Sequence, residues 1–111
     1  MTTYKLSAAT SLKVKNYVQI TQVKECENTL YLEADILDKT FLLKEEIQPF
    51  IDAKKDGLFC IKGRYCVVVS IYRNKVYIGF REYALLGQVM FFTVKEWSKL
   101  MLYIPAILCD V

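Results

Sequence analysis

The sequence contains no histidine, and its four cysteines, Cys26, Cys60, Cys66 and Cys109, include no Cys-x-x-Cys spacing. Most zinc sites use cysteine pairs, histidines or both, so neither a metal site nor a bound cofactor is expected. Catalysis is equally unsupported, because there is no histidine base, no nucleophile with a recognisable partner and no phosphate-binding loop. We therefore expect a protein that is not an enzyme, whose cysteines are small buried hydrophobes with reduced thiols.

The chain also lacks a long apolar run and a strong charge. No segment approaches the length of a membrane span, and the N-terminal stretch has no apolar core of a signal peptide, so we expect an intracellular protein. The net charge of +3 is far below that of proteins that bind nucleic acid by charge alone. Hydrophobic residues make up 54% of the 111 residues, which suffices for the core of one ordinary domain, or of two small halves that bury each other.

The stretch from Phe59 to Tyr83, FCIKGRYCVVVSIYRNKVYIGFREY, is rich in β-branched and aromatic residues. Two apolar runs within it are separated by a basic turn at residues 72–75, which contains an asparagine. This composition predicts a hairpin of two long strands.

The first half predicts a similar series of strands. Residues 17–23 alternate between apolar and polar side chains, and residues 30–37 do the same after a polar turn, so a second hairpin is expected. A turn at 38–40 would then lead into a short strand at 41–43.

Each half is expected to end in a helix. In the first half Ile47, Phe50 and Ile51 recur at helical spacing, and we expect a late start, with Gln48 as the cap, Pro49 at the first helical position and an end at Asp56-Gly57. In the second half Thr93 and Glu96 form a capping-box pattern before an apolar stripe that includes Trp97, and Pro105 is expected to end the helix.

The two halves can be aligned with a shift of about 48 positions, as expected for an internal repeat. Tyr17 then falls on Tyr65, Val23 on Ile71 and Tyr31 on Tyr77. We therefore predict two tandem ββββα repeats, residues 1–56 and 57–111, which together form one compact domain. The alternative is an α+β domain without internal symmetry.

The second half resembles the single-stranded-DNA-binding domain of the positive-cofactor-four type of transcriptional coactivator. The resemblance rests on residues 59–83, above all the run KVYIGFREY from Lys75, and on the helix segment Trp97-Ser98-Lys99-Leu100. It implies an α+β fold of strongly curved antiparallel sheets, whose two units pair through their helices as an intramolecular pseudo-dimer. It also implies single-stranded DNA as the ligand, a role in transcription, replication or recombination, and residence in the nucleus or another DNA-containing compartment.

Binding to single strands requires cations for the phosphates and flat side chains on which bases stack. The candidate residues in the second half are the cations Lys62, Arg64, Arg73, Lys75 and Arg81 and the stacking residues Tyr72 and Tyr77. In the first half the candidates are Lys13, Lys15 and Lys24, with Tyr17 and Tyr31 as weaker ones. The sequence departs from the family at Ala84, where an aromatic residue is expected, and in the uncharged loop 85–89, where a basic one is expected.

Structural interpretations of the same residues remain open. The tyrosines are commonly amphipathic sheet residues, Arg81 and Glu82 can form a structural ion pair, and Trp97 is expected in the core. The alternative function is a protein-interaction module that keeps the fold without nucleic-acid binding. RNA as the ligand, transcription or replication proteins as partners, and a homo-oligomer formed through the apolar C-terminal tail or a helix stripe also stay open.

Overall fold

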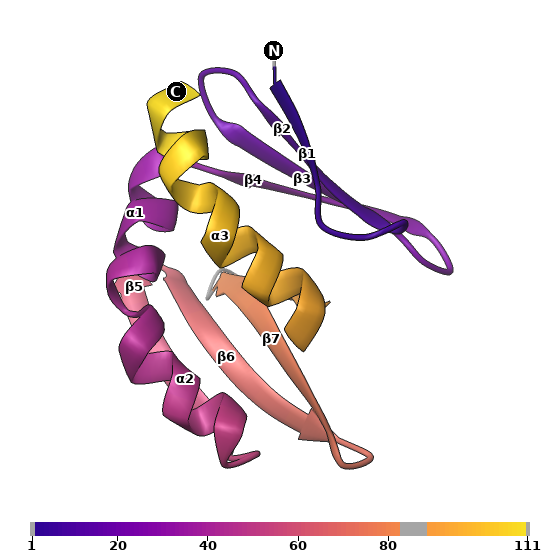
Figure 1. Cartoon of the computed structure of the whole chain (residues 1–111), viewed down its shortest axis with the longest axis vertical. Helices are drawn as coiled ribbons and strands as arrows, with labels where there is room; N and C mark the ends of the chain where they lie inside the picture. Colours follow the sequence, from indigo (N-terminus) through magenta and orange to yellow (C-terminus); the bar gives the residue numbers. More distant parts are fainter. Residues whose placement is uncertain (1, 83–88, 111) are drawn as a thin grey trace.

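The computed structural model describes residues 2–82 and 89–110, with only the backbone of Val89 (Figure 1). The fold is α+β, with two four-stranded antiparallel sheets whose strands follow chain order. The first sheet contains β1 (Thr2–Lys5), β2 (Thr10–Val14), β3 (Val18–Val23) and β4 (Glu27–Leu32), and is followed by α1 (Ala34–Leu42) and α2 (Lys44–Asp52). The second contains β5 (Gly57–Lys62), β6 (Tyr65–Tyr72), β7 (Lys75–Glu82) and β8 (Val89–Thr93), and is followed by α3 (Val94–Asp110).

The hairpin of β6 and β7 confirms the strongest prediction from the sequence. The strands pair in register from Tyr65 opposite Glu82 to Tyr72 opposite Lys75, which leaves Arg73 and Asn74 as the turn. Both turn residues have positive φ, 50° and 63°, as a type I′ turn requires. Asn tolerates this conformation, so the local sequence alone specifies the hairpin.

The start of α3 is the predicted capping box. The Thr93 amide donates to Glu96 Oε1 at 2.9 Å, and the Glu96 amide donates to Thr93 Oγ1 at 3.2 Å. Trp97 is buried as expected, with its ring centroid 5.8 Å from that of Phe80. Pro105 does not end the helix, because α3 continues to Asp110.

The physical reason for this continuation is burial on both sides of the proline. Pro105 removes one helical hydrogen bond, at a cost of about 3 kcal/mol. Ile104 and Ile107 are both fully buried, so breaking the helix would expose the second of these side chains. Of the apolar C-terminal tail, Ile107 is therefore packed in the core of its own chain, with Leu108 partly buried against it.

The segment after β4 differs most from the prediction. The strand expected over 30–37 ends at Leu32, and helix α1 replaces the expected turn at 38–40 and the short strand at 41–43. Alternation over so few residues is compatible with either structure, and burial of Ile36, Leu37 and Thr40 on one helical face decides for the helix.

Helix α2 begins at Lys44, so Gln48 is not its cap and Pro49 lies inside it. It ends at Asp52, and the residue with a left-handed backbone after it is Lys54, with φ 50°. Gly57, expected just past the helix, is the first residue of β5.

The polar N-terminus forms a strand that sequence reasoning missed. Because β1 pairs with β2, the strand β3 is third in its sheet, whereas β6 is second in its own. The shift of about 48 positions therefore aligns strands of different rank, and the residue pairs that it predicted do not occupy corresponding places. All half-buried strands share the same alternation, so alternation cannot fix which strand corresponds to which.

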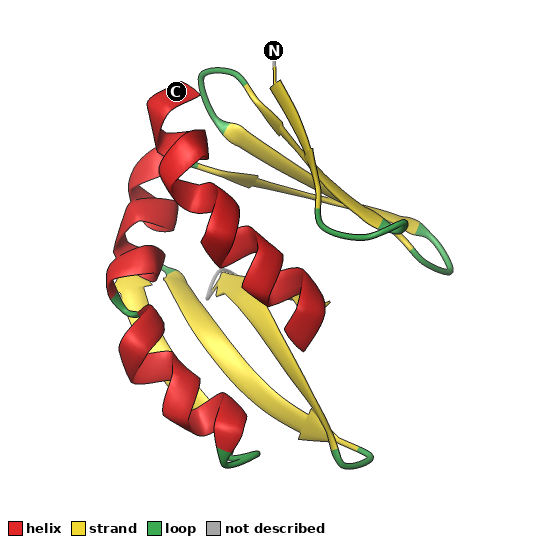
Figure 2. Ribbon diagram, viewed as in Figure 1, coloured by secondary structure: helices red, strands yellow, loops and turns green. Residues whose placement is uncertain are grey.

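The helices connect the two sheets (Figures 1 and 2). Helix α2, which follows the first sheet, packs against β5 and β6 of the second. Helix α3 packs against β7 and β8 and also against β2, and α1 contacts α3. One hydrophobic cluster includes buried residues of both sheets and of all three helices. No helix among the described residues is long and apolar enough to cross a membrane.

The cysteines contradict one expectation. Only Cys66 is buried, whereas Cys26, Cys60 and Cys109 are exposed. Three of the four side chains therefore do not serve as core hydrophobes.

Candidate nucleic-acid interface

The two faces of the second sheet differ in their role. Val67, Val69, Ile78 and Phe80 point to the hydrophobic core. Because side chains alternate along a strand, the other face, here called the outer face, carries their neighbours. It includes the predicted site residues Tyr72, Lys75, Tyr77 and Arg81, together with Ser70 and Phe91.

A hollow on this outer face brings three of the predicted residues together. Tyr72, Tyr77 and Lys24 line a cavity of about 450 Å³, here called the aromatic groove, with Ser70, Phe91 and Gln22 as its other walls. Tyr72 is 60% exposed, and Tyr77 and Phe91 are half-buried. The groove thus offers three aromatic rings and one ammonium group to solvent.

The groove lies where the two sheets meet. The side-chain amide of Gln22, at the end of β3, donates to the Phe91 carbonyl at 2.9 Å and to Thr10 Oγ1 at 3.2 Å. The bond to the Phe91 carbonyl attaches the first sheet to β8, and the bond to Thr10 links Gln22 to β2 within the first sheet. The walls of the aromatic groove therefore come from both halves of the chain.

Lys24 is held near a buried acid. Its ammonium nitrogen lies 4.0 Å from Glu96 Oε1. Burial would raise the pKa of Glu96, but hydrogen bonds from Ser7, Thr10 and the Thr93 amide, together with the Lys24 charge, outweigh it and hold that pKa below its usual value. Because Lys24 remains about half exposed, with 45% of its side-chain surface accessible, it can still reach an anion in the groove.

Two further cations lie beside the groove at the β6–β7 turn. The Arg73 guanidinium carbon is 5.3 Å from the centre of the Tyr72 ring, which is within cation–π range. Lys75 starts β7 opposite Tyr72 and is exposed. Lys54 donates to the Asn74 carbonyl at 3.3 Å and adds a third positive charge next to this turn.

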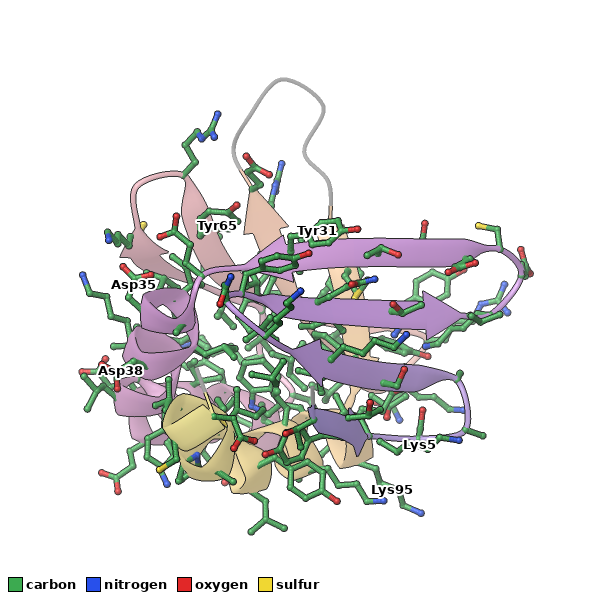
Figure 3. All side chains as sticks on the ribbon, turned by 90° about the horizontal axis from the view of Figure 1, so that it is seen from above. Lys5, Tyr31, Asp35, Asp38, Tyr65 and Lys95 are labelled. Carbon is green, nitrogen blue, oxygen red and sulfur yellow. The ribbon has the colours of Figure 1, made fainter. Side chains whose placement is uncertain are left out.

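A second cavity of about 450 Å³ lies between the first sheet and the β5–β6 turn. Its walls include Tyr17, Tyr31 and Tyr65 and the predicted cations Lys62 and Arg64. Tyr17 and Tyr31 form an edge-to-face pair, with ring centroids 5.5 Å apart. Tyr31 and Tyr65, both labelled in Figure 3, line this cavity, which is here called the tyrosine pocket.

The cations of the tyrosine pocket are already paired with acids. Lys62 donates a short hydrogen bond to Asp35 of α1, which raises the pKa of Lys62 and lowers that of Asp35. Arg64 forms an ion pair with Glu82 at 3.2 Å, so the acid that was expected beside Arg81 is bound to Arg64. A phosphate in this pocket would have to compete with these carboxylates.

The remaining predicted cations are spread over other surfaces. Lys13 lies in register with Gln19 and Tyr31 on the exposed face of the first sheet, and Lys15 is in the following turn. Arg81 is on the outer face of the second sheet, two residues along β7 from Gly79, which pairs with the groove residue Phe91. The structure therefore divides the predicted site into the groove, the tyrosine pocket and these peripheral cations.

Comparisons with protein-family models, with curated proteins and with solved structures found no match for this chain.

Sequence reasoning missed three residues of the groove, Gln22, Ser70 and Phe91. Phe91 was detectable in principle, because two consecutive aromatic residues in a strand must face opposite sides and only Phe92 is in the core. Gln22 and Ser70 gave no such signal. Ala84 and the loop 85–89, where the sequence differs from the pattern of the family that it resembles, lie outside the residues whose side chains are described.

Proposed function

We propose that this chain binds single-stranded nucleic acid, with single-stranded DNA as the preferred ligand, and that it acts without catalysis in transcription, replication or recombination. The observation that carries the proposal is the aromatic groove, where Tyr72, Tyr77 and Phe91 surround an open hollow next to Lys24. Aromatic faces bordered by cations are the combination that sequence-tolerant binding of single strands requires.

The magnitudes are consistent with this role. A stacked base contributes about 1–3 kcal/mol, so one or two bases in the groove give useful affinity only together with phosphate contacts. Arg73, Lys75 and Lys24 supply three exposed positive charges around the groove. A volume of about 450 Å³ is sufficient for a base with part of its sugar, since small-molecule sites fall between roughly 300 and 1,000 Å³.

The proposal extends to the finer architecture. We interpret the chain as two tandem ββββα units that form an intramolecular pseudo-dimer with curved sheets. Support comes from the identical strand order of the sheets, from the contact between α1 and α3, and from the packing of α2 on the second sheet. Such an arrangement would let both sheets contact one strand of nucleic acid.

The direct test is the binding of a fluorescently labelled oligonucleotide at several salt concentrations. The slope of log affinity against log salt is expected to be about −0.7 for each phosphate contact. An absence of binding at low salt would contradict the proposal and would favour the alternative of a protein-interaction module.

Charge reversal at the turn provides a sharper test. The double variant Arg73→Glu and Lys75→Glu should lose most of its affinity and show a shallower salt slope, because two phosphate contacts become repulsions. The matched control is Lys95→Glu with Lys99→Glu, since both lysines are exposed on α3 and the net charge changes equally. Equal losses in the two double variants would show that only the net charge matters and would refute a specific role for the turn.

A further inference from the structure

Two cysteines on the outer face of the second sheet are direct neighbours across two strands. Cys60 of β5 is paired in register with Cys66 of β6. Residues directly opposite each other in an antiparallel pair have Cα atoms about 4.5–5.5 Å apart and side chains on the same face. A disulfide requires a Cα separation of about 4.4–6.8 Å, so the backbone already meets this requirement.

The surroundings give the two thiols different access to solvent. Cys60 is exposed, whereas Cys66 is 1% exposed and its thiol donates to the Arg81 carbonyl at 3.6 Å. The other two cysteines belong to distant elements, Cys26 to the β3–β4 turn and Cys109 to the end of α3. A reagent in solution therefore reaches Cys60 before it reaches Cys66.

We propose that Cys60 and Cys66 are a redox-sensitive modification site, which low-molecular-weight disulfides such as oxidised glutathione convert into an intramolecular disulfide. In the first step the Cys60 thiolate attacks the reagent, forms a mixed disulfide and releases one molecule of reduced glutathione. In the second step the Cys66 thiolate attacks the Cys60 sulfur, closes the protein disulfide and releases the second glutathione. Each cysteine loses one proton, and the reagent accepts the two electrons.

The disulfide would act on an edge strand. Within the described residues β5 pairs only with β6, and its ladder is interrupted by a register shift between Cys60 and Lys62. A disulfide between Cys60 and Cys66 would therefore join β5 covalently to β6 at the last regular residue pair before the register shift. We expect slower amide hydrogen exchange in β5 after oxidation, because opening of the edge strand becomes restricted.

The test uses the full chain with Cys26→Ser and Cys109→Ser, so that only the pair remains. After incubation with oxidised glutathione and alkylation of the residual thiols, mass spectrometry should show a monomer that has lost two hydrogens and carries no alkyl group. Dithiothreitol should restore two alkylatable thiols. Persistence of both thiols, accumulation of an unclosed glutathione adduct, or cross-linked dimers would each overturn the proposal.

Single variants in this background separate the two steps. With Cys66→Ala the reaction should stop at Cys60 with one glutathione attached, and with Cys60→Ser the shielded Cys66 should remain unmodified over the same time. Two cysteines this close in sequence could also form a disulfide in an unfolded chain, so the equilibrium constant for disulfide formation is measured both in the folded protein and in urea. The constant of the folded protein should be larger by roughly tenfold or more, because the fold holds the two thiols close together, and equal constants would refute the role of the fold. None of these outcomes depends on nucleic-acid binding, so this inference and the proposed function fail separately.

Discussion

Replacement of Glu96 by Gln tests the contact that joins the first sheet to α3. The carboxylate is 3% exposed and accepts hydrogen bonds from the Ser7 hydroxyl at 2.6 Å, from the Thr10 hydroxyl and from the Thr93 amide. Hydrogen bonds to charged groups contribute about 1.5–3 kcal/mol each, and neutral ones about 1 kcal/mol. Gln keeps an acceptor for the amide but loses the charge opposite both hydroxyls, so we expect a loss of about 2 kcal/mol in unfolding free energy.

The pH dependence follows from the lowered pKa of Glu96 in the folded chain. A carboxyl whose pKa is lower when folded stabilises the protein at pH values above its unfolded pKa of about 4.3, and this stabilisation disappears as pH falls through the folded pKa. Gln does not titrate. The difference in unfolding free energy between the unmodified protein and Glu96→Gln should therefore have its full value at pH 7. It should become smaller when the pH is lowered below about 4.

Urea denaturation followed by circular dichroism measures both effects, and the loss corresponds to a fall in melting temperature of roughly 10 °C. The matched control is Glu45→Gln, an exposed acid in the first turn of α2. It should change stability by less than about 0.5 kcal/mol. If Glu96→Gln matches this control at pH 7, or if its effect persists unchanged in acid, the account of Glu96 as a charged link is wrong.

Three further substitutions test the fold. Gly79→Ala should destabilise the protein by about 1–3 kcal/mol in thermal unfolding, because the added Cβ would lie 2.8 Å from the Met90 carbonyl oxygen; an unchanged melting temperature would contradict this. Asn74→Gly should raise the stability by about 0.5 kcal/mol in the same assay by relieving the positive φ in the hairpin turn, and a loss of stability would count against the turn type. Leu100→Ala should cost about 2–5 kcal/mol in urea denaturation and lower the transitions of both sheets together, because Leu100 lies in the shared core; separate transitions would show independent halves.

Local chemistry accounts for the parts of the fold that could be predicted. The hairpin of β6 and β7 needs only β-branched strands and residues that tolerate positive φ, and the capping box needs only Thr93 and Glu96 three positions apart. These elements were found because each is stabilised by residues close in sequence.

The predictions failed where distant residues decide. Residues 34–37 continue the alternation of the predicted strand 30–37, yet burial of Leu37 in the shared core makes them part of a helix. Pro105 marks a helix end by itself, and only burial of Ile107 shows that α3 continues.

The candidate site shows the same division. The sequence alone determined which residues are cationic or aromatic. The register of β6 with β7 then places Tyr72 and Tyr77 on the same face of the second sheet. Only the tertiary structure decided which charges are available, because Lys62 is paired with Asp35 from a helix 27 positions earlier, whereas Arg73 and Lys75 stand beside the aromatic groove. The groove itself exists because β3 meets β8 through Gln22, a contact between residues 69 positions apart. Alternation acts within a strand, but a cavity and an ion pair require that packing bring separate elements together.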